Sequence, residues 1–502
     1  MQLPPQLSHT SQHCIHPSPR KSGISPASIT DTALAELTPT GAAWYFPAPA
    51  SGSYDPVLLT TALEATLAIY PQLCGALSLT PPNNAEYPPH TRRYGRVWVR
   101  WGDDEPGLLL TQAKWGGPLA DVLPMNRGNE AISSAVMPNI FALLRLRPSA
   151  LGPACPGPAA VAQITAFNCG GVALALAAQH ALLDAHALAY VLRDWGTIHT
   201  AMLRGAPQPT ITRTYAPMDL DAHACADTPG PQLEELANTV PQLRLDFWAY
   251  DPSDPNDQAP GWFTRSREPP PELDAADRAA GRPRGPRAPF ETWDADAAVG
   301  DAVLDLSAAD VARLSTPGVS ALDGVLGAAW RAVVRARELD SEVWMHGCVG
   351  LRTRLGLPDD FQGAPLINVS AGLDAKALLG NPGAGARAIR AGIKSVTKDR
   401  ASAVLHHMAN ALDPAREWNV FVGSRNILST SWLGIGAYAA DFGYGTAARV
   451  HPFMPPVDGI IVVMEAKEAG VEHGARGGVS LRLLLREEVL ARVLSDPELV
   501  GK

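Results

Sequence analysis

The chain has no long apolar run and no excess of positive charge. No window of its 502 residues reaches the uncharged apolar length needed to span a bilayer, and the N-terminal stretch MQLPPQLSHTSQHCIHPSPRKSG lacks the apolar core of a signal peptide. The formal net charge is -9, so the surface has no general attraction for phosphate backbones or anionic lipid. We therefore expect a cytoplasmic protein that binds neither nucleic acid nor a membrane.

Cysteine is scarce, and several common catalytic motifs are missing. The 6 cysteines are scattered without CxxC pairs or a His at zinc spacing, which argues against a disulfide framework and a metal site. There is no GxSxG, GxxxxGK[ST], HExxH or strand-GxGxxG-helix unit, so serine hydrolase, P-loop, zincin and Rossmann functions lack their motifs. His406 and His407 lie on a predicted helix with no third ligand nearby, which favours structural roles for both.

What is present is enough apolar sequence for two domains. The chain is 46% hydrophobic and 18% charged, and it exceeds the size at which a single core keeps growing. Between about 218 and 300 the composition shifts to Pro, Asp, Arg and Gly, as in REPPPELDAADRAAGRPRGPRAP. We predict an N-terminal domain over 1–217, a partly mobile crossover linker over 218–300 and a C-terminal domain over 301–502, each domain a mixed sheet flanked by helices.

Local patterns place several elements. Residues 56–79 carry leucines at i, i+4 and i+8, which predicts an amphipathic helix running into a strand. Residues 161–180 predict a hairpin whose NCGG turn has glycines that tolerate positive φ. A helix is predicted from about Ala185 with Asp184 as its N-cap, and another opens with a capping box formed by Ser320 and Asp323.

His180 stands at the exit of the second hairpin strand, four residues before Asp184. The spacing HxxxD occurs about once by chance in a chain of this composition, and a second copy, His223 to Asp227, lies in the predicted linker. A residue at the end of a strand that leads into a helix projects into a cleft edge, so the first copy is the better candidate. From these residues alone, His180 is either a catalytic base or a polar residue at a turn.

Further motifs resolve this ambiguity through a resemblance. HALLDA at 180–185 and DFGYG at 441–445 resemble the HxxxDG and DFGWG signatures of the BAHD acyltransferase family, and TSW at 430–432 lies at the family's spacing before DFGYG. ALEATLAIYPQLCGAL, FNCGG and GLRTRLGLPDDFQGAPLIN match other family segments in the right order. The chain departs from the signatures at Ala185, in place of glycine, and at Tyr444, in place of tryptophan.

The resemblance implies two chloramphenicol-acetyltransferase-like domains with a channel at their interface. Acyl-CoA would enter at one mouth and the acceptor at the other. His180 would be the general base, a role that suits an imidazole with an ordinary pKa of about 6.5. Trp432, helped by Thr430 or Ser431, would donate hydrogen bonds to the oxyanion, although a buried structural tryptophan is an equal alternative.

The resemblance also implies supporting roles. Asp184 would point away from substrate and pair with an arginine of the second domain, Arg352 in preference to Arg354, which would lock the turn that carries His180. The remaining support residues would form a tight structural turn remote from the histidine: Asp441, Gly443 and Gly445.

Coenzyme A carries a 3'-phosphate, which needs cations near one channel mouth. The segment RAIRAGIKSVTK predicts Arg390, Lys394 and Lys398 on one helical face. This face is either a CoA contact or an ordinary solvated surface.

The sequence thus predicts an acyl-CoA-dependent transferase, with acetyl the first choice, that esterifies a hydroxyl of a hydrophobic secondary metabolite. We expect a monomer with no permanently bound cofactor and no metal. Two alternatives remain: a condensation-type enzyme that uses a carrier-tethered acyl donor, and a non-catalytic protein that binds acyl-CoA or a metabolite.

Overall fold

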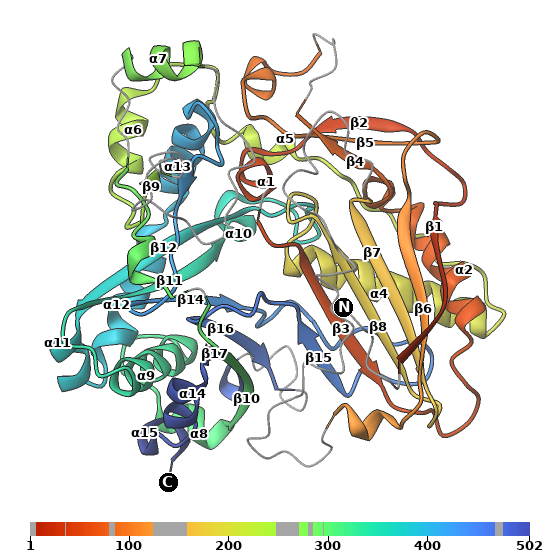
Figure 1. The fold of residues 1–502 in the computed structure, drawn as a ribbon. Coiled ribbons are helices and arrows are strands. Elements are labelled where there is room, and N and C mark those ends of the chain that lie inside the picture. The colour runs from red at the N-terminus through yellow and green to blue at the C-terminus, as the bar shows by residue number, and fades with distance from the viewer. Residues whose placement is uncertain are drawn as a thin grey trace.

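The computed structural model describes residues 7–35, 37–79, 86–123, 158–246, 271–279, 285–294, 296–466 and 475–501. Two six-stranded mixed sheets dominate it, as the sequence predicts (Figure 1). The first has the strand order β1-β6-β7-β8-β3-β15: β1 (Leu7–Ile15), β6 (Leu108–Trp115), β7 (Ala160–Phe167), β8 (Val172–Ala178), β3 (Thr40–Phe46) and β15 (Arg449–Pro452). The second has the order β10-β17-β16-β14-β11-β12: β10 (Val299–Ser307), β17 (Gly478–Arg486), β16 (Ile460–Glu465), β14 (Asn426–Ser431), β11 (Glu342–Gly350) and β12 (Leu366–Asp374).

Helices flank both sheets. The first half holds α1 (Ile29–Leu34), α2 (Pro56–Leu67) and α4 (Ala185–Leu203), with η1 (Pro71–Cys74), η2 (Pro89–Arg92), η3 (Leu119–Asp121) and a small sheet of β2 (Gly23–Pro26), β5 (Trp98–Trp101) and β4 (Ala76–Ser78). The second half holds α8 (Ala308–Arg313), α9 (Ala321–Ala336), α10 (Arg352–Leu355), α11 (Ala375–Gly380), α12 (Ala384–Ser395), α13 (Lys398–Asn410), α14 (Glu487–Leu494) and α15 (Pro497–Val500). Within the described residues, no helix has the length and hydropathy to cross a bilayer.

Several local predictions are confirmed. β7 and β8 form the antiparallel hairpin around residues 168–171, and Gly170 has φ +86° in its turn. Asp184 is the N-cap of α4, accepting a hydrogen bond from the Ala187 N–H at 2.8 Å. Ser320 and Asp323 form the capping box of α9. Each of these depends on neighbours within a few residues, which is why the sequence reveals them.

The two halves share a sheet. β15 lies within 301–502, yet it pairs antiparallel with β3 of the first half, from Arg449 opposite Tyr45 to Pro452 opposite Ala42. Figure 1 shows this blue strand beside the red β3. One apolar cluster also runs through both halves, because β16 residues such as Val462 pack in the same core as Trp44.

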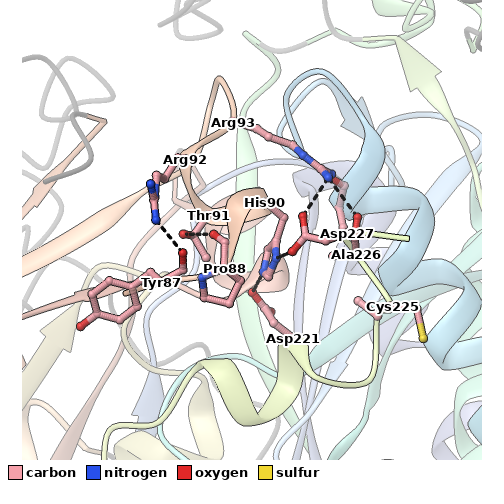
Figure 2. A network of polar contacts seen from close by, with 12 residues as sticks. Tyr87, Pro88, His90, Thr91, Arg92, Arg93, Asp221, Cys225, Ala226 and Asp227 are labelled. Carbon is pink, nitrogen blue, oxygen red and sulfur yellow. Dashed lines mark hydrogen bonds and ion pairs between the residues drawn. The ribbon is translucent and has the colours of Figure 1, made fainter. Parts of the chain in front are cut away.

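The segment between the halves carries regular structure. It contains α5 (Met218–Asp221), α6 (Pro231–Ala237), α7 (Pro271–Ala279), η6 (Phe290–Thr292) and β9 (Leu245–Asp246), which pairs with β13 (Glu417–Trp418). Asp221 and Asp227 of this segment both contact the imidazole of His90 on η2, at 3.1 and 2.8 Å (Figure 2). Arg93 adds an ion pair to Asp227 at 3.0 Å and donates to the Ala226 carbonyl. These contacts tie the crossover to the first half.

His406 and His407 lie on α13, and both have structural partners on other segments. The His406 Nδ1 lies 3.0 Å from the Ala224 carbonyl oxygen. His407 lies between Glu234, 2.7 Å from Nδ1, and Glu417, 3.0 Å from Nε2. Burial disfavours the charged imidazole, but the hydrogen bonds to the two carboxylates outweigh it and raise the pKa of His407 to about 9.

Replacing His407 by Gln tests this pairing. A raised pKa means that the charged histidine stabilises the fold fully below pH 6.5 and loses this effect as the pH rises through about 9. We expect the substitution to lower the free energy of unfolding by about 1–2 kcal/mol at pH 6 and by much less at pH 10. Urea unfolding of both proteins at each pH measures the difference. An equal loss at the two pH values contradicts the charge assignment.

Candidate active site

His180 lies in the turn between β8 and α4. The residue is partly exposed, but its Nδ1 is buried, and no other described residue hydrogen-bonds its imidazole. Nε2 is therefore the ring nitrogen open to a ligand. Burial lowers the pKa of His180; a hydrogen bond to its own backbone and the charge of Asp184 oppose this effect only in part. The lowered pKa favours the neutral imidazole, the form that is able to accept a proton.

The turn is held by an ion pair between the two halves. Arg352, the first residue of α10, donates from Nη1 and Nη2 to the two carboxylate oxygens of Asp184, at 2.6 and 2.9 Å. Both residues are buried, at 7% and 8% exposure. Asp184 also caps α4, so its carboxylate is engaged both by Arg352 and by the Ala187 N–H. Arg354 instead donates only to backbone carbonyls, those of Gly350, Val396 and Ile393.

Backbone contacts complete this junction. The Asp184 N–H donates to the Gly363 carbonyl at 3.1 Å, and Arg352 also donates to the Phe361 carbonyl at 2.8 Å. The Ala364 N–H donates to the buried carboxylate of Asp31 at 2.6 Å. Sequence reasoning missed Asp31 and the 361–364 segment as contributors. The SxxD capping box of α1 was visible in the sequence, but its contact with Ala364 joins residues 333 apart.

Strand register assigns the direction of the TSW residues. Thr430 pairs with Val462, and Val462 belongs to the core shared by both halves. Because side chains alternate along a strand, Thr430 and Trp432 face the first half, whereas Ser431 faces the other way and is exposed. Trp432 is 2% exposed, and its backbone N–H donates to the Val463 carbonyl at 2.8 Å. It packs in the same cluster as Leu182 and Leu183, which follow His180.

The 441–445 turn supports the far end of α4. The Asp441 side chain accepts hydrogen bonds from the N–H groups of Gly443 and Gly445, at 2.7 and 2.9 Å. Both glycines have positive φ, +89° and +102°, so the turn needs them. Phe442 is fully buried and meets Trp195 of α4 edge-to-face at 5.3 Å. The 441–445 turn therefore packs against the helix whose N-cap is Asp184.

Tyr444 adopts its own packing in this turn. It meets Tyr54 edge-to-face at 5.1 Å and donates to the Ser53 carbonyl at 3.3 Å. The tyrosine at this position thus anchors the turn to the segment before α2.

The expectation that three cations share one helical face is wrong. α12 ends at Ser395 and α13 begins at Lys398, so Lys398 is not on the helix of Arg390 and Lys394. The Arg390 guanidinium pairs with Asp323 at 2.5 Å. α12 packs on α9 over the sheet face opposite the first half, because Ile389 shares its core with α9. We therefore assign no CoA contact to Arg390, Lys394 or Lys398.

The second HxxxD copy does not form a similar site. Asp227 is engaged by His90 and Arg93, as Figure 2 shows, and no hydrogen bond joins it to His223. Among the described residues, no three His, Cys, Asp or Glu side chains converge as a metal ion would require.

Replacing Arg352 by Met tests the ion pair, with Arg354→Met as its matched control. Loss of Arg352 leaves the buried Asp184 carboxylate without its cation, so we expect the free energy of unfolding to fall by about 3–5 kcal/mol. Among the described residues, Arg354 pairs with no carboxylate, so its replacement should cost about 1 kcal/mol. Chemical denaturation measures both values. Equal losses would show that the ion pair with Asp184 does not contribute more to the free energy of unfolding than the backbone contacts of Arg354.

Comparisons with known proteins agree with this geometry. The family model "Transferase family" matches residues 141–246 and 299–500. The chain is 25% identical to acyltransferase abl6 of Leptosphaeria maculans over 98% of this chain and 97% of the relative. It superposes on vinorine synthase with a TM-score of 0.59 at 17% identity, covering 99% and 98% of the two chains. It superposes on TRI101 of F. graminearum complexed with ethyl coenzyme A with a TM-score of 0.60 at 15% identity, covering 96% and 99%. The chain therefore belongs to the transferase family of BAHD acyltransferases, and it is an acyltransferase.

Proposed function

We propose that this protein transfers an acyl group, acetyl by preference, from acyl-CoA to a hydroxyl of a hydrophobic secondary metabolite, with His180 as general base. The observation that carries the proposal is the neutral imidazole of His180, open at Nε2 and fixed by a buried ion pair between the two halves. CoA as the donor is supported by the TRI101 structure, which is complexed with ethyl coenzyme A. We further propose that the protein works as a cytoplasmic monomer.

The reaction proceeds in one ternary complex. His180 Nε2 accepts the proton of the acceptor hydroxyl while its oxygen attacks the thioester carbonyl. The resulting oxyanion accepts hydrogen bonds from the Trp432 indole and the Thr430 hydroxyl, donors on the sheet face toward the first half. When the C–S bond breaks, the imidazolium returns the proton to the CoA thiolate. No covalent enzyme intermediate forms, and Asp184 keeps the turn fixed without touching the substrate.

The choice of a hydrophobic acceptor rests on the surroundings of this turn. Ala181, Leu182 and Leu183 are fully buried and lie in the apolar cluster that both halves share. These residues are core rather than pocket walls, and a site that opens beside this apolar cluster favours an apolar ligand with one reacting polar group.

Replacing His180 by Ala tests the base. We expect acyl transfer to fall by ~10²–10⁴-fold, the contribution typical of general-base catalysis, without a change in the circular dichroism spectrum. The assay follows CoA thiol release from acetyl- through benzoyl-CoA with a panel of small alcohols, and product masses identify the substrates. His223→Ala, in the second HxxxD copy, is the control and should keep full activity.

Each alternative has its own outcome in that assay. CoA binding without thiol release by any acceptor supports a binding protein. Transfer only from a carrier-tethered acyl group supports a condensation-type enzyme. A His180→Ala variant with wild-type rate removes the proposed mechanism.

The pH profile gives a separate test. Burial lowers the pKa of His180 below 6.5, so the base is deprotonated at neutral pH and protonates only in acid. We expect kcat/KM to be level near pH 7 and its acid limb to have a midpoint below 6.5. A midpoint above 6.5 would contradict the assignment of the desolvated imidazole as the base.

A further inference from the structure

The segment of residues 359–365, here called the bridging loop, meets the His180 turn directly through its backbone, beside the Arg352 ion pair. It joins α10 to β12, and its carbonyls at Phe361 and Gly363 accept hydrogen bonds from Arg352 and from the Asp184 N–H. Any shift of this loop therefore changes the backbone contacts that position the His180 turn. What holds the loop to the first half also determines the geometry around His180.

A second arginine reaches the bridging loop from the first half. Arg213, which follows α4, donates from Nε and Nη2 to both carboxylate oxygens of Asp194, at 2.9 and 3.0 Å. Its Nη1 donates to the Asp360 carboxylate in the bridging loop at 2.8 Å. Asp194 is buried on α4, and the Tyr70 hydroxyl donates to it at 2.6 Å. One guanidinium thus joins a carboxylate of each half.

The geometry makes this bridge directional. A guanidinium is planar, so two hydrogen bonds to Asp194 fix its plane and leave Nη1 pointed at Asp360. The guanidinium carbon also lies 4.6 Å from the centre of the Tyr190 ring, which adds a cation–π contact. Tyr190 itself donates to Asp359, the neighbouring residue of the loop, at 2.7 Å. The loop is thus held along α4 at several points.

We propose that Arg213 is a positioning residue for acyl transfer: it fixes the bridging loop to α4 and so keeps the His180 turn in register with the second half. The inference rests on the proposed role of His180. Arg213 itself touches neither substrate nor the reacting atoms. Its contribution passes through Asp360 to the backbone contact between Gly363 and Asp184.

Asp360→Asn is the sharpest variant, because it weakens the bridge between the halves and leaves Arg213 paired with the buried Asp194. Glu498→Gln is the matched control. Asp360 and Glu498 side chains are both 34% exposed, and both pair with arginine, but Glu498 binds Arg331 and Arg335 wholly within the second half. Both variants remove one partly buried carboxylate charge, so a general loss of stability should affect Glu498→Gln at least as strongly as Asp360→Asn.

We expect Asp360→Asn to lower kcat about tenfold while KM for acyl-CoA and acceptor stays within about twofold. The acid limb of kcat/KM should move up toward pH 6.5, because a looser junction admits water and relieves the desolvation of His180. Glu498→Gln should change neither quantity. Arg213→Lys, which keeps a charge but loses the planar fork to both Asp194 and Asp360, should lower kcat at least as much as Asp360→Asn.

Hydrogen exchange supplies a readout that needs no activity. The Asp184 amide donates to Gly363, so its exchange rate reports the junction directly. Asp360→Asn should speed this exchange at least fivefold, and Glu498→Gln should not. Equal behaviour of the two variants in exchange, kcat and acid limb overturns the proposal. If instead His180→Ala keeps its activity, the proposed function fails, and the exchange result still decides whether Arg213 holds the junction.

Discussion

The buried ion pair between Asp184 and Arg352 is the constraint on which the rest of the site depends. A carboxylate and a guanidinium in a dry interior repay their desolvation only when their geometry is right, and here both oxygens of Asp184 are engaged by one arginine. The same carboxylate caps α4, so a single group fixes where the helix begins, how the turn before it bends and which half of the chain lies opposite. His180 inherits its position from that group.

α4 connects this ion pair to the 441–445 turn of the second half. Its first residue follows Asp184, and the far end of the helix packs against the 441–445 turn through Phe442. Gly196 lets the helix approach that turn closely, because a Cβ there would lie 2.7 Å from the Asp441 carbonyl oxygen. Because the second half contacts the helix at both ends, α4 fixes the distance between the two contacts. The motif at 180–185 and the motif at 441–445, far apart in the sequence, therefore serve one element.

Sequence reasoning succeeded where the physics is local and where a motif could be recognised. The hairpin of β7 and β8, the N-cap at Asp184 and the capping box at Ser320 follow from neighbours a few residues apart. The preference for Arg352 over Arg354 came from family resemblance, and geometry agrees with it. The helix break before Lys398 was missed because RAIRAGIKSVTK continues an amphipathic pattern through it. No local sequence pattern predicts the hydrogen bond between Arg213 and Asp360. The two residues are 147 positions apart, and they meet only when both halves have folded.

The pairing of β15 with β3 has a consequence for how the chain is made. About 400 residues separate these two strands. A ribosome adding ~5–20 residues per second therefore needs about 20–80 s between them. Once β8 has been made, the first sheet lacks only β15, and it keeps an unpaired edge of backbone N–H and C=O groups at β3; such edges recruit strands from other chains. Nascent chains of this protein are therefore exposed to mispairing at Thr40–Phe46 until β15 has been made and pairs there.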